Sequence, residues 1–201
     1  MKSIIMNSTM SFIKKNCNYD ETKLAEIKYG LEGLYLTITK LIVIIISALI
    51  LNLEKEVLTF LLIYNIIRMP SFGLHATKSW ICLLSSLTIF ILVPWLAVNI
   101  HMTIFVKYIL GIILILLFYK NSPADTEKRP IINKKRRLVY KLISTITAII
   151  FVILSLIIEN KFISNSFLFS LIIQASMISP LVYKVFNLPY NNYLKYLNEV
   201  I

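Results

Sequence analysis

Six hydrophobic runs dominate this chain of 201 residues and constrain what it can fold into. They cover residues 34–51, 56–67, 80–98, 102–119, 138–158 and 162–183. A helix needs on the order of 20 apolar residues to cross a bilayer, and five of the runs reach or approach that length. The chain is 58% hydrophobic, with a mean hydropathy of +0.77, whereas soluble domains are roughly 45 to 50% apolar. The sequence therefore predicts an all-α integral membrane protein with about six transmembrane or re-entrant helices.

The N-terminal region predicts amphipathic helices at the membrane surface. From about residue 20, apolar residues recur at helical spacing with charged residues between them, which is typical of a helix with one apolar face. A weaker apolar stripe in residues 3–15 suits a second, shorter surface helix. We expect a single membrane domain over residues 1–201. In it, residues 1–33 form interfacial helices, residues 34–183 hold the six hydrophobic segments, and residues 184–201 form a cytoplasmic tail.

The second hydrophobic run is too short to span a bilayer unless it extends through Arg68 toward Leu74. Pro70 and Gly73 allow a helix to end or turn there. We therefore expect this helix to stop inside the membrane just before His75.

The distribution of lysine and arginine predicts the orientation of the chain. Cytoplasmic loops of membrane proteins carry an excess of these residues. If the N-terminus is cytoplasmic, seventeen basic residues fall on the inside, three (Lys55, Lys107 and Lys161) fall outside, and Lys40 lies within the first run. The seventeen inside residues are Lys2, Lys14, Lys15, Lys23, Lys28, Arg68, Lys78, Lys120, Lys128, Arg129, Lys134, Lys135, Arg136, Arg137, Lys141, Lys184 and Lys195. A multi-pass topology with both termini in the cytoplasm follows.

His75 and Cys82 are the candidate catalytic residues. A thiol and an imidazole together can perform covalent cysteine catalysis, and the chain has only two residues of each type. Cys82 begins the third hydrophobic run, so we expect it near a helix N-terminus, where the helix dipole stabilises a negative charge. The alternative is a cysteine that only fills space in a membrane helix.

The spacing of this pair predicts a folded loop. Seven residues of continuous helix would separate the two Cα atoms by roughly 10 Å, too far for an easy hydrogen bond. We infer that His75 lies on a loop or re-entrant turn, where Gly73 lets the backbone fold back toward Cys82.

A basic loop joins the fourth and fifth hydrophobic runs, from Lys120 to Arg137. Such a loop is either a cytoplasmic stop signal that touches anionic lipid headgroups or a docking surface for an acidic peptide. Asp125 within it is a candidate for orienting His75 as the third member of a catalytic group. The loop also contains the candidate substrate-binding residues Lys128, Arg129, Lys134, Lys135, Arg136 and Arg137.

The histidines and cysteines of the chain predict neither a cofactor nor a metal site. His75 and His101 are far apart in the sequence and offer no ligand cluster, so we expect no metal. Cys17 and Cys82 cannot form a dense disulfide framework, which favours reduced thiols. The lipid bilayer is the expected partner of the hydrophobic runs, and no nucleic-acid partner is expected.

The chain resembles the AgrB membrane peptidases of bacterial quorum sensing. The resemblance covers essentially the full length and rests on two motifs, Arg68-x4-Gly73-x-His75-Ala76-x5-Cys82 and Ser122-Pro-Ala-Asp-Thr-Glu-Lys-Arg-Pro130 with its basic tail. Many members of that family have a Gly-Gly pair before the histidine, where this chain has Phe72-Gly73.

The resemblance implies a location in the bacterial cell membrane and a cysteine endopeptidase activity. His75 and Cys82 match the family's catalytic pair, and Arg68 and Gly73 match positions that imply support of the active loop. The implied substrate is an AgrD-like propeptide with an acidic C-terminal tail, which is removed while the remainder is cyclised into a thiolactone or lactone. The resemblance also implies a homodimer.

Two other functions fit a chain of this architecture. A peptide exporter without proteolysis is one, although the hydrophobic runs hold few of the ionisable residues that mark a transport path. A noncatalytic membrane partner of a histidine kinase is the other, and for that protein Cys82 would be dispensable.

Overall fold

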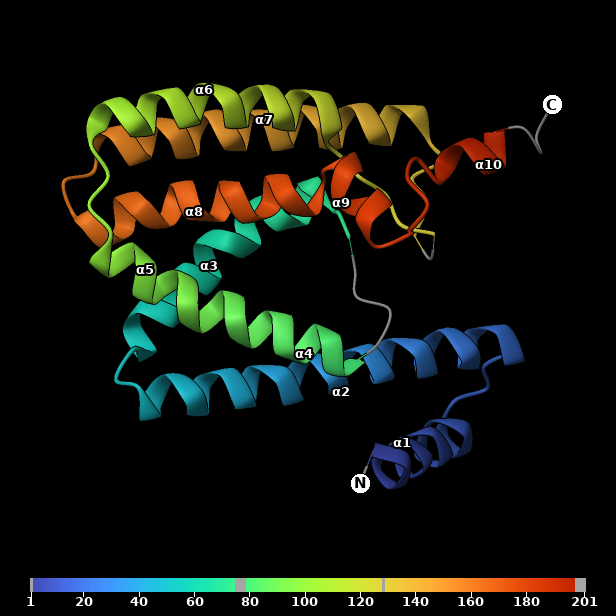
Figure 1. Ribbon diagram of the computed structural model, residues 1–201. Helices are drawn as coiled ribbons and strands as arrows, with labels where there is room; N and C mark the ends of the chain where they lie inside the picture. Colours follow the sequence, from blue (N-terminus) through green and yellow to red (C-terminus); the bar gives the residue numbers. More distant parts are fainter. Residues whose placement is uncertain (1, 75–78, 128, 198–201) are drawn as a thin grey trace. The chain divides into compact units, whose positions relative to one another are not determined.

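The structure of the chain, a computed structural model, describes residues 2–74, 79–127 and 129–197, which form helices, loops and two isolated β-bridges but no strand (Figure 1). The helices are α1 (Lys2–Asn16), α2 (Glu21–Ile50), α3 (Glu54–Ser71), α4 (Ser79–Leu87), the π-helical segment η1 (Thr88–Leu92), α5 (Val93–Asn99), α6 (Ile104–Asn121), α7 (Lys134–Ile157), α8 (Lys161–Met177), α9 (Pro180–Val185) and α10 (Tyr193–Leu197). All six hydrophobic runs are therefore helical, and the predicted all-α class is confirmed.

The chain divides into two compact units, Met1–Ser47 and Ala48–Ile201. The first unit contains α1 and most of α2. The Asp20 carboxylate caps α2 by accepting a hydrogen bond from the Lys23 N–H at 3.0 Å, which satisfies one of the free donors of the first turn. The predicted amphipathic helix and the first hydrophobic run form one continuous helix. Residues 3–15 are helical as predicted and lie in α1, and their position at the membrane surface stays a prediction. The expectation of one membrane domain stays a prediction.

In the second unit, α8 is the central helix, because it contacts α3, α5, α6 and α7. Figure 1 shows α6 and α7 side by side, with α8 next to them and α3 on its other side. The core between these helices holds Ile67, Phe118, Phe151, Leu168 and Leu171, all nearly or fully buried. The most enclosed residues of the unit therefore lie around α3 and α8.

Within the described part of the chain, four helical stretches are long and apolar enough to cross a membrane. They are Glu21–Ile50, Trp80–Asn99, Ile104–Asn121 and Lys134–Ile157. The other two hydrophobic runs form α3 and α8, whose buried faces carry polar side chains that bond within the protein, such as Tyr64 to Gln174 at 3.3 Å. Enclosed helices tolerate these side chains because their polar groups meet protein rather than lipid. The chain is an all-α membrane protein, and the number of about six spanning or re-entrant helices stays a prediction.

The third hydrophobic run is a single irregular helix. Its first part, α4, leads into the π-helical turns of η1 and then into α5, which contains Pro94. Proline has no N–H to bond the carbonyl of Phe90, four residues earlier, and its ring crowds that carbonyl. A π-bulge before the proline relieves this conflict while the helix continues.

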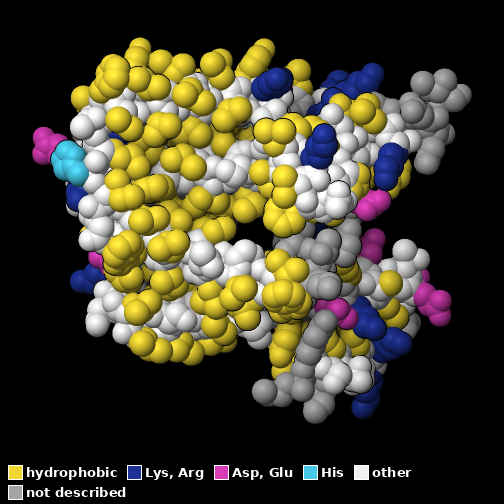
Figure 2. Space-filling model, viewed as in Figure 1, with side chains coloured by type: hydrophobic (Ala, Val, Ile, Leu, Met, Phe, Trp, Pro, Cys, Tyr) yellow, Lys and Arg dark blue, Asp and Glu magenta, His cyan; other side chains and the backbone are white. Residues whose placement is uncertain are grey.

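Apolar and basic side chains occupy different parts of the exposed surface of the second unit. Hydrophobic side chains cover much of the face in Figure 2, and several Lys and Arg side chains lie near the end where α7 begins and α10 lies. The end of α6, the first turns of α7 and α10 contain Lys120, Lys134, Lys135, Arg136, Arg137, Lys141 and Lys195. This arrangement matches a protein whose apolar flanks face lipid and whose basic end faces an aqueous phase.

Candidate active-site loop

The α3 helix ends in a tight turn that only glycine can complete. Phe72, the C-terminal cap, has φ 58°, and Gly73 follows with φ 104°. A Cβ atom on Gly73 would lie 2.8 Å from the Met177 carbonyl oxygen and 2.9 Å from Nη1 of Arg68. Both the backbone conformation and the space therefore require glycine at position 73. The predicted helix end before His75 is confirmed, at Ser71, with Pro70 inside the last turn. Its position inside the membrane stays a prediction.

Phe72 occupies a conformation that L-residues rarely adopt. Its ring packs edge-on against Tyr140 of α7, with ring centroids 4.9 Å apart. This contact holds the strained residue in place. A Gly-Gly pair would adopt the same turn more easily, which explains why the Phe72-Gly73 pair needs an aromatic partner.

Arg68 binds the carbonyl groups of the three residues that follow α3. Its Nη1 donates to the Phe72 oxygen at 2.5 Å, and its Nη2 donates to the Leu74 oxygen at 2.9 Å and, at 3.5 Å, to the Gly73 oxygen. A guanidinium presents its donors in one rigid plane, so it can hold three successive carbonyls that a lysine ammonium could not hold together. The support of the loop by Arg68 and Gly73, which the sequence implies through a resemblance, has this geometric basis.

Gln174 and Tyr64 complete the same network, and neither was singled out in the sequence. The Gln174 amide is fully buried. Its Nε2 donates to the Phe72 oxygen at 2.8 Å, while its Oε1 accepts from Tyr64 at 3.3 Å and from Arg68 at 3.4 Å. The amide therefore fixes both the guanidinium and the turn. The sequence feature that could have predicted this role is a glutamine inside an otherwise apolar run, because such a residue needs a partner within the protein.

Backbone hydrogen bonds join the two sequence motifs at this turn. The Gly73 N–H donates to the Ala124 oxygen at 2.7 Å, and the Ala124 N–H donates to the Ser71 oxygen at 3.1 Å. The Leu74 N–H donates to the Met177 oxygen at 2.9 Å, at the end of α8. The residues immediately before His75 are thus held on one side by the second motif and on the other by α8.

Of the proposed catalytic pair, only Cys82 lies within the described residues. It is the fourth residue of α4 and is half-buried, which agrees with the predicted position near a helix N-terminus. His75 lies outside the described residues, as does Lys128 of the basic loop. Leu74 and Cys82 are the described positions on either side of the histidine, and the pairing of imidazole and thiol stays a prediction.

Asp125 anchors the C-terminal segment through backbone N–H groups. Its carboxylate is buried and accepts from the N–H of Asn192 at 2.9 Å and of Tyr193 at 2.8 Å, with a longer contact from Ile131 at 3.4 Å. Both carboxylate oxygens therefore have partners in the described chain. The role of orienting His75 stays a prediction.

Tyr190 extends the same anchor. It donates its hydroxyl proton to the Asn121 oxygen at 3.3 Å. Burial, and to a lesser extent Asp125 and Tyr193, raise the pKa of Tyr190, so the phenol keeps this proton at neutral pH.

The remaining candidate binding residues form the basic start of α7. Arg129, Lys134, Lys135 and Arg136 are exposed, whereas Arg137 is half-buried. Asn133 caps the helix by accepting from the N–H groups of residues 135 and 136 at 2.9 and 3.2 Å. Its first turn contains cations and no acidic residue, so their charge adds to the positive end of the helix dipole. This end of α7 is therefore a strongly positive surface.

No group of three or more His, Cys, Asp or Glu side chains within residues 2–74, 79–127 and 129–197 is placed to hold a metal ion. Neither Cys17 nor Cys82 forms a disulfide in the described part of the chain.

Comparison with known proteins matches residues 6–178 to the family described as accessory gene regulator B. A protein of Listeria innocua named "Putative AgrB-like protein" is 33% identical over 177 residues, 88% of this chain and 87% of that protein. A protein of Clostridium acetobutylicum with the same name is 27% identical over 92% of this chain and 88% of its own length. The "Accessory gene regulator protein B" of Staphylococcus aureus strain Newman is 31% identical over 86% of this chain and 90% of its own length. No solved structure matches the chain.

Replacing Asp125 with Asn tests the anchor of the C-terminal segment. An amide accepts through one oxygen only, so its NH2 group would face a backbone N–H that now bonds the carboxylate. We expect Asp125→Asn to lower the local stability of residues 190–197 by about 1.5–3 kcal/mol, the usual contribution of hydrogen bonds to a charged group. Backbone hydrogen exchange followed by mass spectrometry measures this as faster exchange in that segment.

Glu127→Gln is the matched control for Asp125→Asn. Glu127 also links the loop to the C-terminal segment, through Lys195 at 3.2 Å, but both side chains of this ion pair are more than half exposed. Exposed pairs contribute little, so exchange should stay near that of the unmodified protein. Equal acceleration in both variants would contradict the assignment of Asp125 as the anchor.

Proposed function

The chain belongs to the accessory gene regulator B family, and we propose from this membership and from the geometry before His75 that it is a membrane cysteine endopeptidase. The family places it in the processing of a quorum-sensing autoinducer. Its proposed substrate is an AgrD-like propeptide, which it cleaves before an acidic C-terminal tail and cyclises. The observation that carries the proposal is the clamp on residues 72–74 by Arg68 and Gln174.

The clamp supports the proposal because a catalytic base must be held within hydrogen-bond reach of the proton that it removes. Three carbonyls and three backbone N–H groups of residues 72–74 have fixed partners. The chain therefore enters His75 from a rigid segment rather than from a free loop. Cys82, on the other side of residues 75–78, lies in the first turn of a helical stretch that runs from Ser79 to Asn99.

In the proposed first step, His75 accepts the proton of the Cys82 thiol and the sulfur attacks the carbonyl carbon at the tail junction. The tetrahedral intermediate collapses as the C–N bond breaks and His75 returns the proton to the leaving amine. The N-terminal part of the propeptide then forms a thioester with Cys82, and the acidic tail is released.

In the second step, a cysteine or serine side chain within the bound peptide attacks the thioester. A thiolactone or lactone ring forms, and the sulfur of Cys82 leaves and recovers its proton. Water must be kept away, because hydrolysis of the thioester would give a linear peptide. A site at the membrane boundary favours this exclusion and also captures an amphipathic substrate. Because an amide is more stable than a thioester, removal of the tail or of the product drives the reaction.

The exposed basic side chains at the start of α7 suit the acidic tail. No salt bridge joins Arg129, Lys135 or Arg136 to a described residue. Their charges are therefore not neutralised by a carboxylate of the described chain. Charge complementarity of this kind raises the rate of encounter and orients the partner. With the excess of Lys and Arg at this end, we place it and the active site on the cytoplasmic side of the membrane.

The Cys82→Ser and His75→Ala variants test the catalytic pair. Each should abolish tail release when the protein is co-expressed with the propeptide encoded beside it, because each removes a reacting group. Mass spectrometry of the released tail and of the cyclic product measures this. Cys17→Ser is the matched control, since it removes the other thiol and should leave processing intact. Tail release by Cys82→Ser would contradict the mechanism, and export of uncleaved peptide would favour a transporter.

The Arg68→Lys variant tests the clamp. Lysine keeps the charge but loses the planar donors, so we expect kcat for tail release to fall about 100-fold, the effect of a misplacement of about 1 Å. The KM for the propeptide should stay the same, because Arg68 binds backbone rather than substrate.

Arg129→Gln provides the opposite pattern in the same assay. It removes an exposed charge from the proposed tail surface, so KM should rise while kcat stays the same. A rise in KM with unchanged kcat for Arg68→Lys would show that this side chain binds substrate and would contradict its positioning role.

A further inference from the structure

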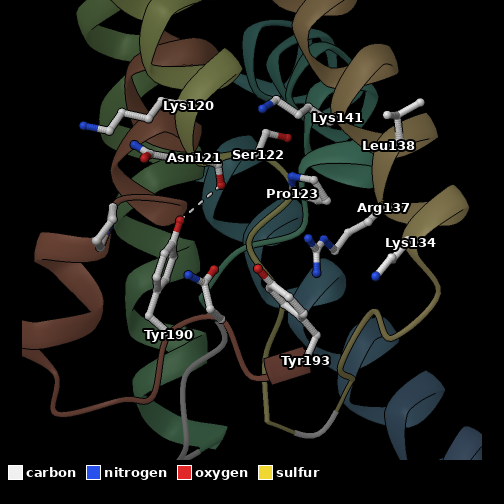
Figure 3. A pocket seen from close by; sticks show the side chains of 12 residues that line it. Lys120, Asn121, Ser122, Pro123, Lys134, Arg137, Leu138, Lys141, Tyr190 and Tyr193 are labelled. Carbon is white, nitrogen blue, oxygen red and sulfur yellow. Dashed lines mark hydrogen bonds between the residues drawn. The ribbon is translucent and has the colours of Figure 1, made fainter. Parts of the chain in front are cut away.

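A cavity of about 600 Å³ lies where α6 ends, α7 begins and the C-terminal segment folds back. Figure 3 shows its lining: Lys120 and Ser122 from the end of α6, Arg137 and Lys141 from α7, and Tyr190 and Tyr193 from the C-terminal segment. Lys134 also lines it, and none of its lining residues is acidic. The cavity is therefore lined by four cations without a carboxylate to balance them, a setting that favours an anionic ligand.

Two buried donors in this basic cavity have no hydrogen-bond partner among the described residues. The side chain of Ser122 is 5% exposed, and its hydroxyl is unpaired. Nη1 of Arg137 is likewise buried and unpaired. Buried polar groups almost always have partners, and those without one in an otherwise bonded structure mark a place for a ligand or water. Two residues that line the cavity thus each carry a donor that no described protein group satisfies.

The orientation of Arg137 suits such a ligand. Its guanidinium carbon lies 3.4 Å from the centroid of the Tyr193 ring, so its face is stacked. Stacking uses the face and leaves the N–H groups at the edge available to oxygen atoms. The Tyr193 backbone is in turn fixed by Asp125 at 2.8 Å. The described chain therefore holds the guanidinium in place without bonding its Nη1.

An apolar row on α7 begins at the cavity. Leu138 lines the cavity and is 61% exposed, and Leu142, Ile146 and Ile150 follow it at four-residue spacing with exposed side chains. Residues four apart lie along one ridge of a helix. Lys134–Ile157 is long and apolar enough to cross a membrane, so an exposed apolar ridge along it is suited to contact with acyl chains, with the cavity at its N-terminal end.

From these observations we infer that the basic cavity binds the headgroup phosphate of an anionic phospholipid, whose acyl chain lies along the α7 ridge that starts at Leu138. Basic pockets between the cytoplasmic ends of membrane helices are suited to such headgroups. An acidic peptide would match the charge but would leave the exposed ridge beside the cavity unused. The lipid would offset the cations in the first turn of α7 and join α6, α7 and the C-terminal segment.

The test measures lipid retention by the purified full-length protein with native mass spectrometry in a mild detergent. The probes are phosphatidylglycerol, phosphatidylcholine with the same acyl chains, glycerol 3-phosphate, and a peptide of six glutamates. Phosphatidylglycerol should be retained and phosphatidylcholine should not. Neither glycerol 3-phosphate nor the peptide should displace the bound lipid. Retention of both lipids alike, or displacement by either soluble anion, would overturn the proposal.

Two variants distinguish lipid binding in the cavity from nonspecific electrostatic attraction of the lipid to the basic surface. Arg137→Gln should weaken phosphatidylglycerol binding at least about tenfold, as expected for one charge-assisted hydrogen bond. The double variant Lys135→Gln/Arg136→Gln is the matched control, because it removes two exposed charges from the same turn of α7. It should weaken binding less than the single change. A larger loss in the double variant would overturn the proposal.

Ser122→Ala keeps the test valid if Arg137→Gln does not fold. Removing an unpaired buried hydroxyl should not lower the melting temperature of the lipid-free protein. The increase in melting temperature that phosphatidylglycerol produces should become smaller, because one donor to the phosphate is lost. An unchanged lipid-dependent increase would contradict the role of Ser122 in the cavity.

Discussion

The guanidinium of Arg68 is the interaction on which the proposed site depends. The α3 helix stops at Ser71, and the carbonyl groups of residues 72–74 that follow it need partners outside a helix. A carbonyl without a partner is costly where no water is available. Arg68 binds three carbonyls in succession, and the fully buried amide of Gln174 fixes both Arg68 and the first of these carbonyls. The side chains of Arg68 and Gln174 thereby supply the hydrogen bonds that a further turn of helix would have given these carbonyls. The backbone can leave the helix at Phe72 and Gly73, and its conformation in residues 72–74, immediately before His75, is fixed.

This clamp also explains why the two motifs belong together although about fifty residues separate them. The backbone of Ala124 exchanges hydrogen bonds with Ser71 and Gly73, so the second motif forms part of the turn that precedes the histidine. One residue later, Asp125 binds the backbone of Asn192 and Tyr193. The second motif therefore connects the candidate active-site loop to the C-terminal segment, and its basic continuation at the start of α7 forms the charged surface beside both.

The sequence predicted the features that depend on local patterns. Hydrophobic runs located the helices, the helix end before His75 followed from Gly73, and the lone thiols and imidazoles limited the candidates for catalysis. The bond of Arg68 to Gln174 and those of Asp125 to Asn192 and Tyr193 join residues 106, 67 and 68 positions apart, and no local period or propensity encodes them. The sequence could have predicted part of the role of Gln174, since a glutamine in an apolar run requires a protein partner. That this partner is Arg68 follows only from the packing of α3 on α8. Pro70 shows the opposite case, because a residue that usually stops a helix is accommodated in the last turn of α3.

The most direct test of the central claim is capture of the thioester on Cys82. A propeptide whose ring-forming cysteine or serine is replaced by alanine can be cleaved but cannot cyclise, so the acyl-enzyme should accumulate. Intact mass spectrometry of the protein should show the added mass of the peptide without its tail, located on Cys82 and removed by hydroxylamine. Release of the tail at the normal rate by the unmodified protein, without any adduct on Cys82 under rapid acid quench, would contradict the account.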